Sequence, residues 1–429
     1  MPVAPGRFER RRKKPRPDVE TSLCRAVLLS PELQVLVHAY QDGIFEDLCL
    51  YAKEARAILR RGCCVTDAAM LLILPERYYA QYRTKTLSSD DLCLDPARRE
   101  LLALHLAVFE GRLDIVQRWL RCHPEHLTSR AVDCATQFAH ISIVQWLLPQ
   151  TPGTTTAVDL AAKIGHLELV QLLLAASPTG GGSHRALDFA AAHGHLDVLW
   201  YLHTHTSLGA SRRALDSAAA GGHENVVRFL DEHRGEGCTT DAMDDAAAHN
   251  HKGVVVYLHT HRDEGCTILA MDAAAAHGHL DMVEWLHRNR HEGCSRRAMD
   301  WAATNGHLAV VQWLHAHRLE GCSPAAMDGA AGNGHLEVVI FLHEHRREGC
   351  TTVAMDDAAK NGFLNVVQWL HEHRGEGGTE AGIADTRDAG FDDIADFMRA
   401  HCSADVADTS CAEASDDESD AADGWDDDD

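Results

Sequence analysis

The stretch AMDAAAAHGHLDMVEWLHRNRHEGCS, residues 270–295, decides the fold because close copies of it recur along the chain. AMDWAATNGHLAVVQWLHAHRLEGCS follows at 298–323 and AMDGAAGNGHLEVVIFLHEHRREGCT at 326–351, which sets a period of 28 residues. Self-similarity at a fixed period of this size is the signature of stacked repeats. The glycine in the middle of each copy belongs to a series of eleven anchors: Gly111, Ala139, Gly165, Gly194, Gly222, Asn250, Gly278, Gly306, Gly334, Gly362 and Gly390.

Each copy predicts two short helices joined by a tight turn. A Ser or Thr eleven residues before the anchor is typical of a helix N-cap, and Pro324 after Ser323 suits the first helical position. An alanine-rich helix, helix A, follows, and glycine at the anchor allows a positive φ. Helix B then carries apolar residues at helical spacing, such as Leu280, Val283 and Leu286. Such short pairs bury their apolar faces only by stacking, so we predict an all-α fold, an α-solenoid of about eleven helix–turn–helix repeats.

The core AAAHGHLDMVEWL at 274–286 resembles the ankyrin repeat, and GHLELVQLLL at 165–174 resembles it more closely still. Two features depart from that family. The tetrapeptide TPLH is replaced by x-A-[ML]-D, as at 269–272, and the unit has 28 residues instead of about 33. The missing residues fall where the family has a β-hairpin finger. The resemblance therefore implies ankyrin-like helix pairs with shortened or absent fingers, and binding of a partner protein through the concave helix A surface.

The remainder of the chain predicts three flanking segments around an array at 99–402. Residues 1–19 are predicted to be a disordered basic arm, 20–98 a helical capping region, and 403–429 a disordered acidic tail. The stretch 28–43 has a faint resemblance to an F-box, so the alternative function is a substrate adaptor of a ubiquitin ligase with the array as substrate receptor. The arm holds a candidate nuclear-localisation signal, with a solvated arm as the alternative: Arg10, Arg11, Arg12, Lys13, Lys14 and Arg16.

The composition limits the kinds of molecule that the chain is expected to bind. The formal net charge is −24, and residues 405–429 hold twelve Asp or Glu and no Lys or Arg. Nucleic-acid binding needs clustered Lys and Arg, so we predict no nucleic-acid partner and instead a protein partner with a basic surface. Ser415, in the acidic tail, is a candidate phosphorylation site.

Motifs of other functional classes are missing from the sequence. It contains no P-loop, no G-x-S-x-G and no H-E-x-x-H, so we predict a non-enzymatic protein without a cofactor. No run approaches the roughly 20 apolar residues that span a bilayer, and the N-terminal residues lack the apolar core of a secretory signal. We therefore expect a monomeric intracellular protein, cytoplasmic or nuclear, without membrane contact.

Thirty His and 14 Cys suggest metal binding, but their spacing opposes it. Residues two apart on a helix, such as His315 and His317, point in nearly opposite directions. Equivalent His in successive repeats are expected about 10 Å apart, which is too far to share an ion. We interpret the His after each anchor as a cap of helix B, the Cys as small buried residues, and the Asp of helix A as partners of the helix dipole. No metal site is predicted.

Positions that vary while their neighbours stay constant are the candidates for partner binding. They are the residue five before the anchor and the two residues directly before it, on helix A. Trp301 and Phe189 would be aromatic anchors if exposed, and gap filling is the alternative for both. The candidate set is Phe189, His193, Asp245, His249, His277, Trp301, Asn305, Asn333, Asp357 and Asn361.

Overall fold

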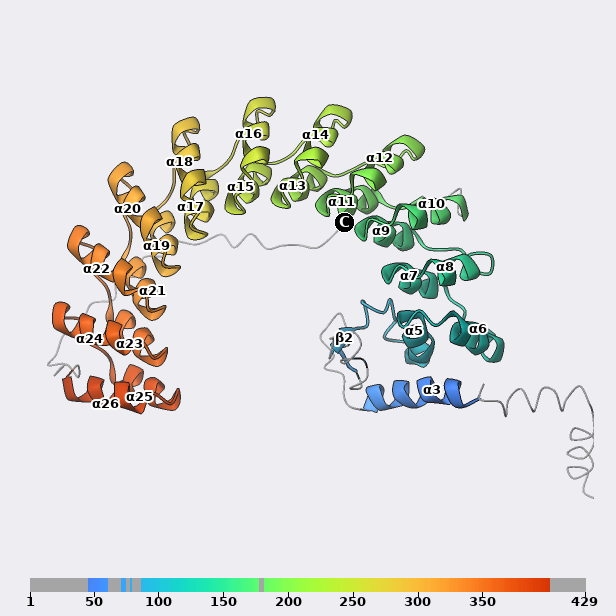
Figure 1. Cartoon of the computed structure of the whole chain (residues 1–429), viewed down its shortest axis with the longest axis horizontal. Coiled ribbons are helices and arrows are strands. Elements are labelled where there is room, and N and C mark those ends of the chain that lie inside the picture. The colour runs from blue at the N-terminus through green and yellow to red at the C-terminus, as the bar shows by residue number, and fades with distance from the viewer. Residues whose placement is uncertain (1–44, 61–70, 75–77, 79–85, 177–180, 402–429) are drawn as a thin grey trace, which may run out of the picture. The chain divides into compact units, whose positions relative to one another are not determined.

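The computed structural model describes residues 45–60, 71–74, 78, 86–176 and 181–401 (Figure 1). Eleven helix pairs follow one another from residue 102, as the anchors predict. The first members, helices A, are Leu102–Phe109 (α5), Ser129–Gln137 (α7), Thr155–Lys163 (α9), His184–Ala192 (α11), Arg212–Ala220 (α13), Asp241–Ala248 (α15), Ile268–Ala276 (α17), Arg297–Thr304 (α19), Pro324–Gly332 (α21), Thr352–Lys360 (α23) and Glu380–Asp388 (α25).

The second members of the pairs, helices B, lie beside them. They are Leu113–Cys122 (α6), Ile141–Leu147 (α8), Leu167–Ala176 (α10), Leu196–His205 (α12), Glu224–His233 (α14), Lys252–His261 (α16), Leu280–Asn289 (α18), Leu308–His317 (α20), Leu336–His345 (α22), Leu364–His373 (α24) and Asp392–His401 (α26). The all-α solenoid of about eleven repeats is thus confirmed.

Positive φ angles at the anchors create the turns between helix A and helix B. Gly278 has φ of 76°, and the two anchors that are not glycine, Ala139 and Asn250, adopt 56° and 60°. The backbone N–H of Gly278 donates to the Ala275 carbonyl oxygen, which closes the end of helix A. The sequence variation at the anchor therefore leaves the turn geometry unchanged.

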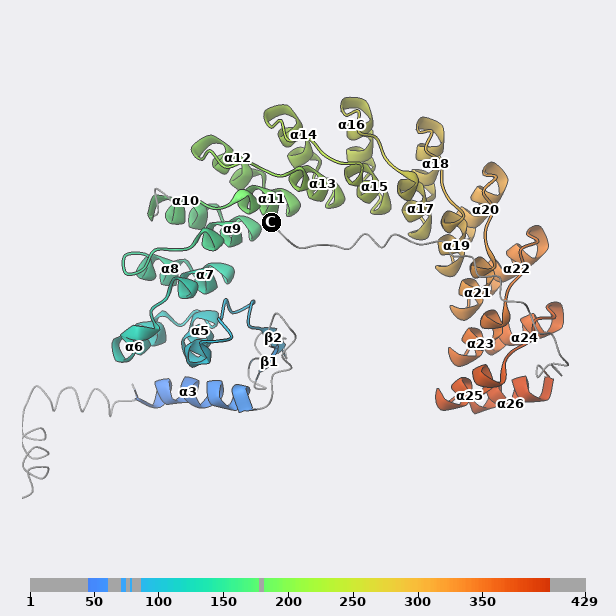
Figure 2. The same cartoon turned by 180° about the vertical axis from the view of Figure 1, so that it is seen from behind.

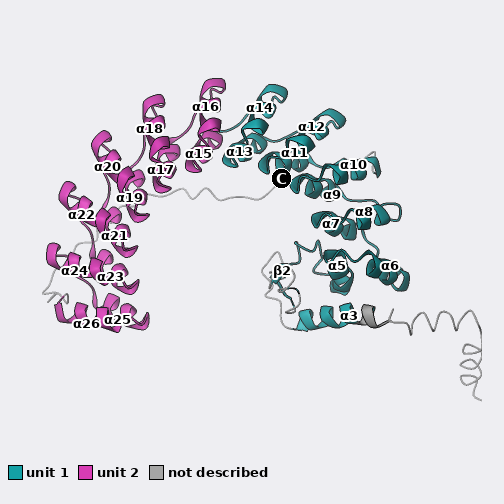
Figure 3. Ribbon diagram, viewed as in Figure 1, with its two compact units in different colours: residues 1–239 teal, residues 240–429 magenta. Residues whose placement is uncertain are grey.

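The repeats form two compact units, residues 1–239 and 240–429 (Figure 3). Within each unit, helices A form one row and helices B a second row on its outer side (Figure 2). Successive helices A pack directly on each other, α7 on α9 and α11 on α13 in unit 1, and α17 on α19 in unit 2. Small residues make this close approach possible, as with Ala274 and Ala275, which are fully buried.

The finger of the family is absent from the connections between repeats. Six residues, 262–267, join α16 to α17, seven, 290–296, join α18 to α19, and six, 318–323, join α20 to α21, without any strand between them. The prediction of shortened or absent fingers is confirmed for the described residues of the array. In five connections the finger is replaced by a turn of sequence R-x-E-G-C followed by Ser or Thr: 234–238, 262–266, 290–294, 318–322 and 346–350.

The region before the array is not entirely helical. Helix α3, Phe45–Arg60, packs on α5 and α6, with Tyr51 and Ile58 buried. Strand β1, Leu71–Ile73, pairs antiparallel with β2, Thr86–Ser88. This short sheet corrects the expectation of a helical region over 20–98; its three-residue strands are too short to leave an alternating pattern in the sequence. The remaining elements are 3₁₀ turns at Arg99–Leu101 (η2) and Pro124–His126 (η3).

Among the described residues, no helix has the length and apolar character needed to cross a membrane. The basic arm, the F-box-like stretch 28–43, the acidic tail and Ser415 lie outside the described residues. Their interpretations therefore stay predictions.

Candidate binding surface

In each helix A from α9 to α23, an Asp binds the Ser or Thr that precedes helix A of the next repeat. Asp272 accepts two hydrogen bonds from Ser295, from the backbone N–H at 2.8 Å and from Oγ at 2.5 Å. Burial raises the pKa of Asp272 despite these bonds. The contact corrects our assignment of these Asp to the helix dipole. The same pair of bonds is accepted by Asp159, Asp188, Asp216, Asp244, Asp300, Asp328 and Asp356.

The N-cap residues thus serve two helices at once. Besides binding Asp244, Thr267 accepts a hydrogen bond from the backbone N–H of Leu269 at 3.1 Å. Ser211 makes only the contact with the preceding Asp188, without a cap bond of its own. Capping is therefore confirmed for most of the predicted Ser and Thr but is secondary to the contact between repeats.

The His that follows most of the anchors also joins neighbouring repeats. The His195 ring lies against Gly165, and its Nε2 is 3.1 Å from the Lys163 carbonyl oxygen. His140 makes the equivalent contact with the Phe109 carbonyl oxygen at 3.0 Å. These His occupy the N-cap position of helix B, as predicted, but their side chains make no cap bond to it and bind the preceding repeat instead.

The R-x-E-G-C turn supplies a third contact between repeats. Arg318 pairs with Glu320 in its own turn, and its Nη1 lies 3.4 Å from Nδ1 of His287 in the preceding repeat. Beside this arginine, Cys294 is buried, and burial raises the pKa of its thiol to about 11. Cys266 and Cys322, in the equivalent turns, are likewise buried with a raised pKa, as the sequence predicts for structural thiols.

With these contacts holding the repeats, the varying residues lie on the helix A row, and most of them are exposed. Asp245, Trp301 and Asp357 are exposed on three different helices A, while Phe189 is half-buried. The residues directly before the anchors are all exposed at the ends of their helices: His193, His249, His277, Asn305, Asn333 and Asn361. The predicted residues thus form rows across the repeats and do not converge on one cleft.

The residues directly before the anchors also make hydrogen bonds within the array. The side-chain N–H of Asn305 donates to the Ala276 carbonyl oxygen at 2.7 Å, and Asn361 donates to Gly332 at 2.8 Å. His277 instead places Nδ1 2.9 Å from the carbonyl oxygen of Ala273 in its own helix. These side chains cap helix A and still expose their outer edge.

The two aromatic candidates differ in environment. Trp301 keeps 38% of its surface exposed, and the guanidinium of Arg297 lies 5.9 Å from its ring centroid. Phe189 is half-buried, with the ammonium of Lys163 at 5.8 Å from its ring. The exposure of Trp301 favours the interpretation that it contacts a partner. The half-buried ring of Phe189 is in keeping with the alternative, that it fills a gap, and it also lies near a lysine.

Sequence reasoning missed a third position of this face. The residue four before Trp301 is Arg297, and Asn305 is four after it, so the three share one side of α19. The equivalent first-turn residues are exposed in the other repeats and differ in charge and polarity: Arg185, Arg213, Asp241, Leu269, Ala325 and Val353. The same variability criterion applied to the first turn would have found them.

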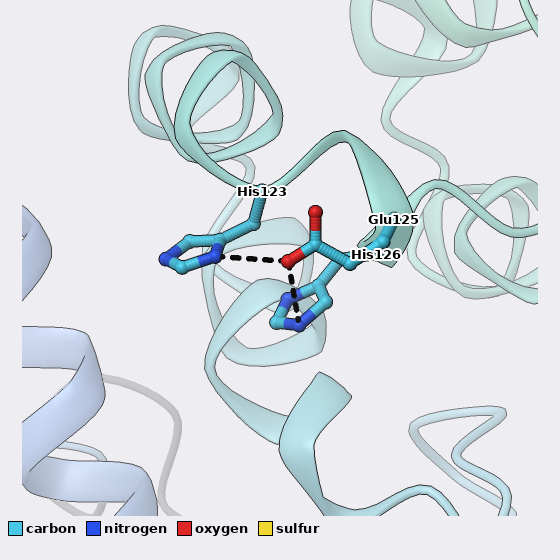
Figure 4. Close-up of side chains that lie close together, drawn as sticks. All are labelled: His123, Glu125 and His126. Atoms are coloured by element: carbon cyan, nitrogen blue, oxygen red, sulfur yellow. Dashed lines mark hydrogen bonds and ion pairs between the residues drawn. The ribbon is translucent and has the colours of Figure 1, made fainter.

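One further cluster has a ligand-like composition. His123, Glu125 and His126, between α6 and α7, place ligand atoms within 4.8 Å of one another (Figure 4). The Trp119 indole N–H donates to Nδ1 of His126 at 3.0 Å, so the neutral ring carries its proton on Nε2, the atom that faces Glu125. A metal-ligating His needs the opposite arrangement, with the other N–H donating outward. The cluster therefore fits a hydrogen-bonded surface group better than a metal site.

Comparison with known proteins identifies the repeat type. Sequence models described as ankyrin repeats in many copies match residues 271–315 and 299–343, and those described as ankyrin repeats in three copies match 133–211 and 158–244. No curated protein matches the chain in a sequence search. Both matched regions lie in the helix pairs described above.

Proposed function

Because the chain belongs to the ankyrin repeat proteins, we propose that it is a non-catalytic scaffold that binds a partner protein through the helix A face. Ankyrin repeats generally mediate protein–protein interaction. One observation carries the proposal for this chain: constant residues make the contacts between repeats, whereas the exposed positions of helix A vary. Asp300 illustrates the constant class with its bonds to Ser323, and Trp301 beside it illustrates the varying class.

The mechanism is preorganisation of the binding face. The helices A from α9 to α25 are fixed to their neighbours by the Asp contact, so their exposed side chains are presented on a rigid row before a partner arrives. Binding to such a surface orders few additional groups and loses little conformational entropy. Trp301 would supply the largest apolar contact area, and aromatic side chains at the centre of an interface carry much of the binding energy.

We propose that unit 2 binds the basic surface predicted for the partner protein. Asp241, Asp245 and Asp357 are exposed on its helix A face. Complementary charge accelerates association, so the association rate with such a partner should fall as salt rises. An association rate that is independent of salt would contradict this part of the proposal. We propose a monomeric state and a cytoplasmic or nuclear location for the same protein, without nucleic acid as partner.

Affinity capture from the native cell with paired variants tests the scaffold function. Trp301→Ala removes the exposed tryptophan of helix α19, and Trp200→Ala removes a tryptophan of helix α12 that is 51% exposed on the helix B row. We expect the first variant to lose captured partners by at least about tenfold, the equivalent of 1.4 kcal/mol, and the second to keep them. Equal loss, or equal retention, in both variants would refute binding through helix A.

The adaptor function stays the alternative and rests on the sequence of 28–43 alone. The same capture experiment with the full chain distinguishes it. Recovery of ubiquitin-ligase subunits at constant ratio to the chain would favour an adaptor, and their absence from the captured proteins would exclude it.

A further inference from the structure

Unit 1 has a helix A face without exposed acidic residues, in a chain with a net charge of −24. On helices α7, α9, α11 and α13, every exposed residue is a base, a histidine or a threonine. The bases are Arg130, Lys163, Arg185, Arg212 and Arg213, which we call the basic strip. The strip is continuous in the sense that α7 packs on α9, α9 on α11 and α11 on α13.

The acidic residues of the same four helices are engaged elsewhere. Asp133, Asp159 and Asp216 are buried, and Asp188 is half-buried. Each accepts a hydrogen bond from the N-cap residue of the following repeat, for example Asp188 from Ser211 Oγ at 2.6 Å. Their carboxylates are therefore turned into the stack and do not reach the exposed ends of the strip residues.

The strip bases themselves have no carboxylate within 4.0 Å among the described residues. Four of them lie in the first turn of their helix, where the dipole disfavours positive charge. The stability of the individual helices therefore does not explain why arginines lie in their first turns. In unit 2 the same first-turn positions are mixed, with Asp241, Leu269 and Ala325 beside Arg296 and Arg297.

We propose that the basic strip binds the acidic segment 405–429 of the same molecule. That segment carries twelve Asp or Glu and no Lys or Arg, so its charge is opposite to that of the strip. Arginine forms two parallel hydrogen bonds with a carboxylate, and the strip offers four arginines. Attachment in one chain raises the effective concentration of the segment above that of any separate acidic protein. The tail thereby competes with acidic partners for unit 1 and leaves the helix A face of unit 2 open.

Zero-length carbodiimide cross-linking of the full chain tests the contact. Lys163 is the only lysine between residues 86 and 251, so a link from it to a tail carboxylate reports the strip specifically. At low protein concentration and low salt, we expect links from Lys163 to 405–429 within single chains, lost in 0.5 M NaCl because salt screens the charges. Lys252, exposed outside the strip, is the internal control and should link at least about tenfold less.

A matched pair of variants controls for general charge. Arg212→Gln with Arg213→Gln removes two strip residues, and Arg296→Gln with Arg297→Gln removes the residues at the same repeat positions in unit 2. All four arginines are exposed, so circular dichroism should show both variants folded. The first variant should lose most of the Lys163 link and the second should keep it. Equal effects of the two variants, equal linking of Lys163 and Lys252, or links only between chains would overturn the proposal.

A second measurement distinguishes the ligand class. The probe is a fluorescent peptide of residues 405–429, titrated by anisotropy into full-length chain whose twelve tail acids are changed to amides. We expect binding that the Arg212→Gln and Arg213→Gln changes weaken at least about tenfold, as the loss of two charge-assisted contacts implies. A single-stranded oligonucleotide of equal charge serves as competitor. If it binds more tightly than the peptide through the same arginines, the strip is a nucleic-acid surface and the proposal is wrong.

Discussion

At the scale of single residues, the anchor position demands one backbone conformation. Gly278 has φ of 76°, and a Cβ built on it would lie 2.6 Å from Nδ1 of His307 in the next repeat. Gly278→Ala therefore introduces both a left-handed strain of about 1–2 kcal/mol and a clash with an inter-repeat contact. We expect the midpoint of urea unfolding to fall.

The matched control is Ala139→Gly. Ala139 already has φ of 56°, so glycine relieves strain at that anchor. The relief is partly offset by the greater freedom of glycine in the unfolded chain, leaving a stabilisation below about 1 kcal/mol. If the two substitutions shift stability in the same direction, the turn does not depend on the positive φ.

His105 is a residue whose titration should be visible in stability. It is fully buried in α5, its Nδ1 lies 2.6 Å from the Leu92 carbonyl oxygen, and Nε2 has no partner. Burial lowers its pKa to about 4. The unfolded chain, with a His pKa near 6.5, takes up the proton first as pH falls. Stability from this group is therefore complete above pH ~6.5 and decreases as pH falls toward 4.

The expected size is about 3 kcal/mol, since each pKa unit corresponds to about 1.4 kcal/mol. Urea unfolding at pH 7 and pH 4.5 measures it. His105→Gln should reduce the pH dependence, and His193→Gln, at an exposed site, should leave it unchanged. An identical pH dependence in His105→Gln and the unsubstituted protein would show that His105 is not responsible.

At the scale of elements, helix A is held to its neighbour through Asp272. Asp272→Ala leaves the backbone N–H and hydroxyl of Ser295 without their acceptor, and bonds to a charged group contribute about 1.5–3 kcal/mol each. Removal of the buried carboxylate also relieves its desolvation cost, so we expect a net loss of about 2–3 kcal/mol in the free energy of unfolding. Asp245→Ala, at an exposed Asp of helix α15, should change it by less than about 0.5 kcal/mol. Similar losses for both would contradict the inter-repeat role.

The helix pairs were predictable because the anchor series and the apolar spacing are local in sequence. The partner of Asp272 was not, because Ser295 belongs to the next unit and spacing alone does not reveal which groups meet. A constant separation of 23 residues from Asp to cap was nevertheless present as a signal from Asp188 onward. The strands at Leu71–Ile73 and Thr86–Ser88 were not predicted, because three residues are too few to show an alternating pattern.

The candidate surface was predicted in part. Two of its three positions on each helix A were found, since they vary next to the constant anchor. Arg213 and its first-turn equivalents were missed. The charge of the face in unit 1 was also missed, because a chain total of −24 hides a local surplus of arginine.

At the scale of the whole molecule, the two ends of the described array differ. Helix α3 covers α5, and Tyr51 bonds to Glu110 there, whereas among the described elements α25 and α26 pack on one neighbouring pair, α23 and α24. In a solenoid, stability is a sum of neighbour contacts, so a terminal pair opens most readily. We expect hydrogen exchange in α26 at least about tenfold faster than in α5 or α18. Exchange in α5 as fast as in α26 would show that α3 does not protect the first repeat.

The contact that repeats at each junction from α9 to α25 has a consequence for how such a gene changes length. Asp272 binds Ser295, and Asp300 binds Ser323 in the same way. Loss of the 28 codons for residues 295–322 would bring Ser323 to the place of Ser295, opposite Asp272. The new junction would keep the same two hydrogen bonds between repeats. A duplication of 28 codons would likewise keep them at its new junctions. Recombination between copies can thus lengthen or shorten the array while each surviving helix A keeps its own surface residues.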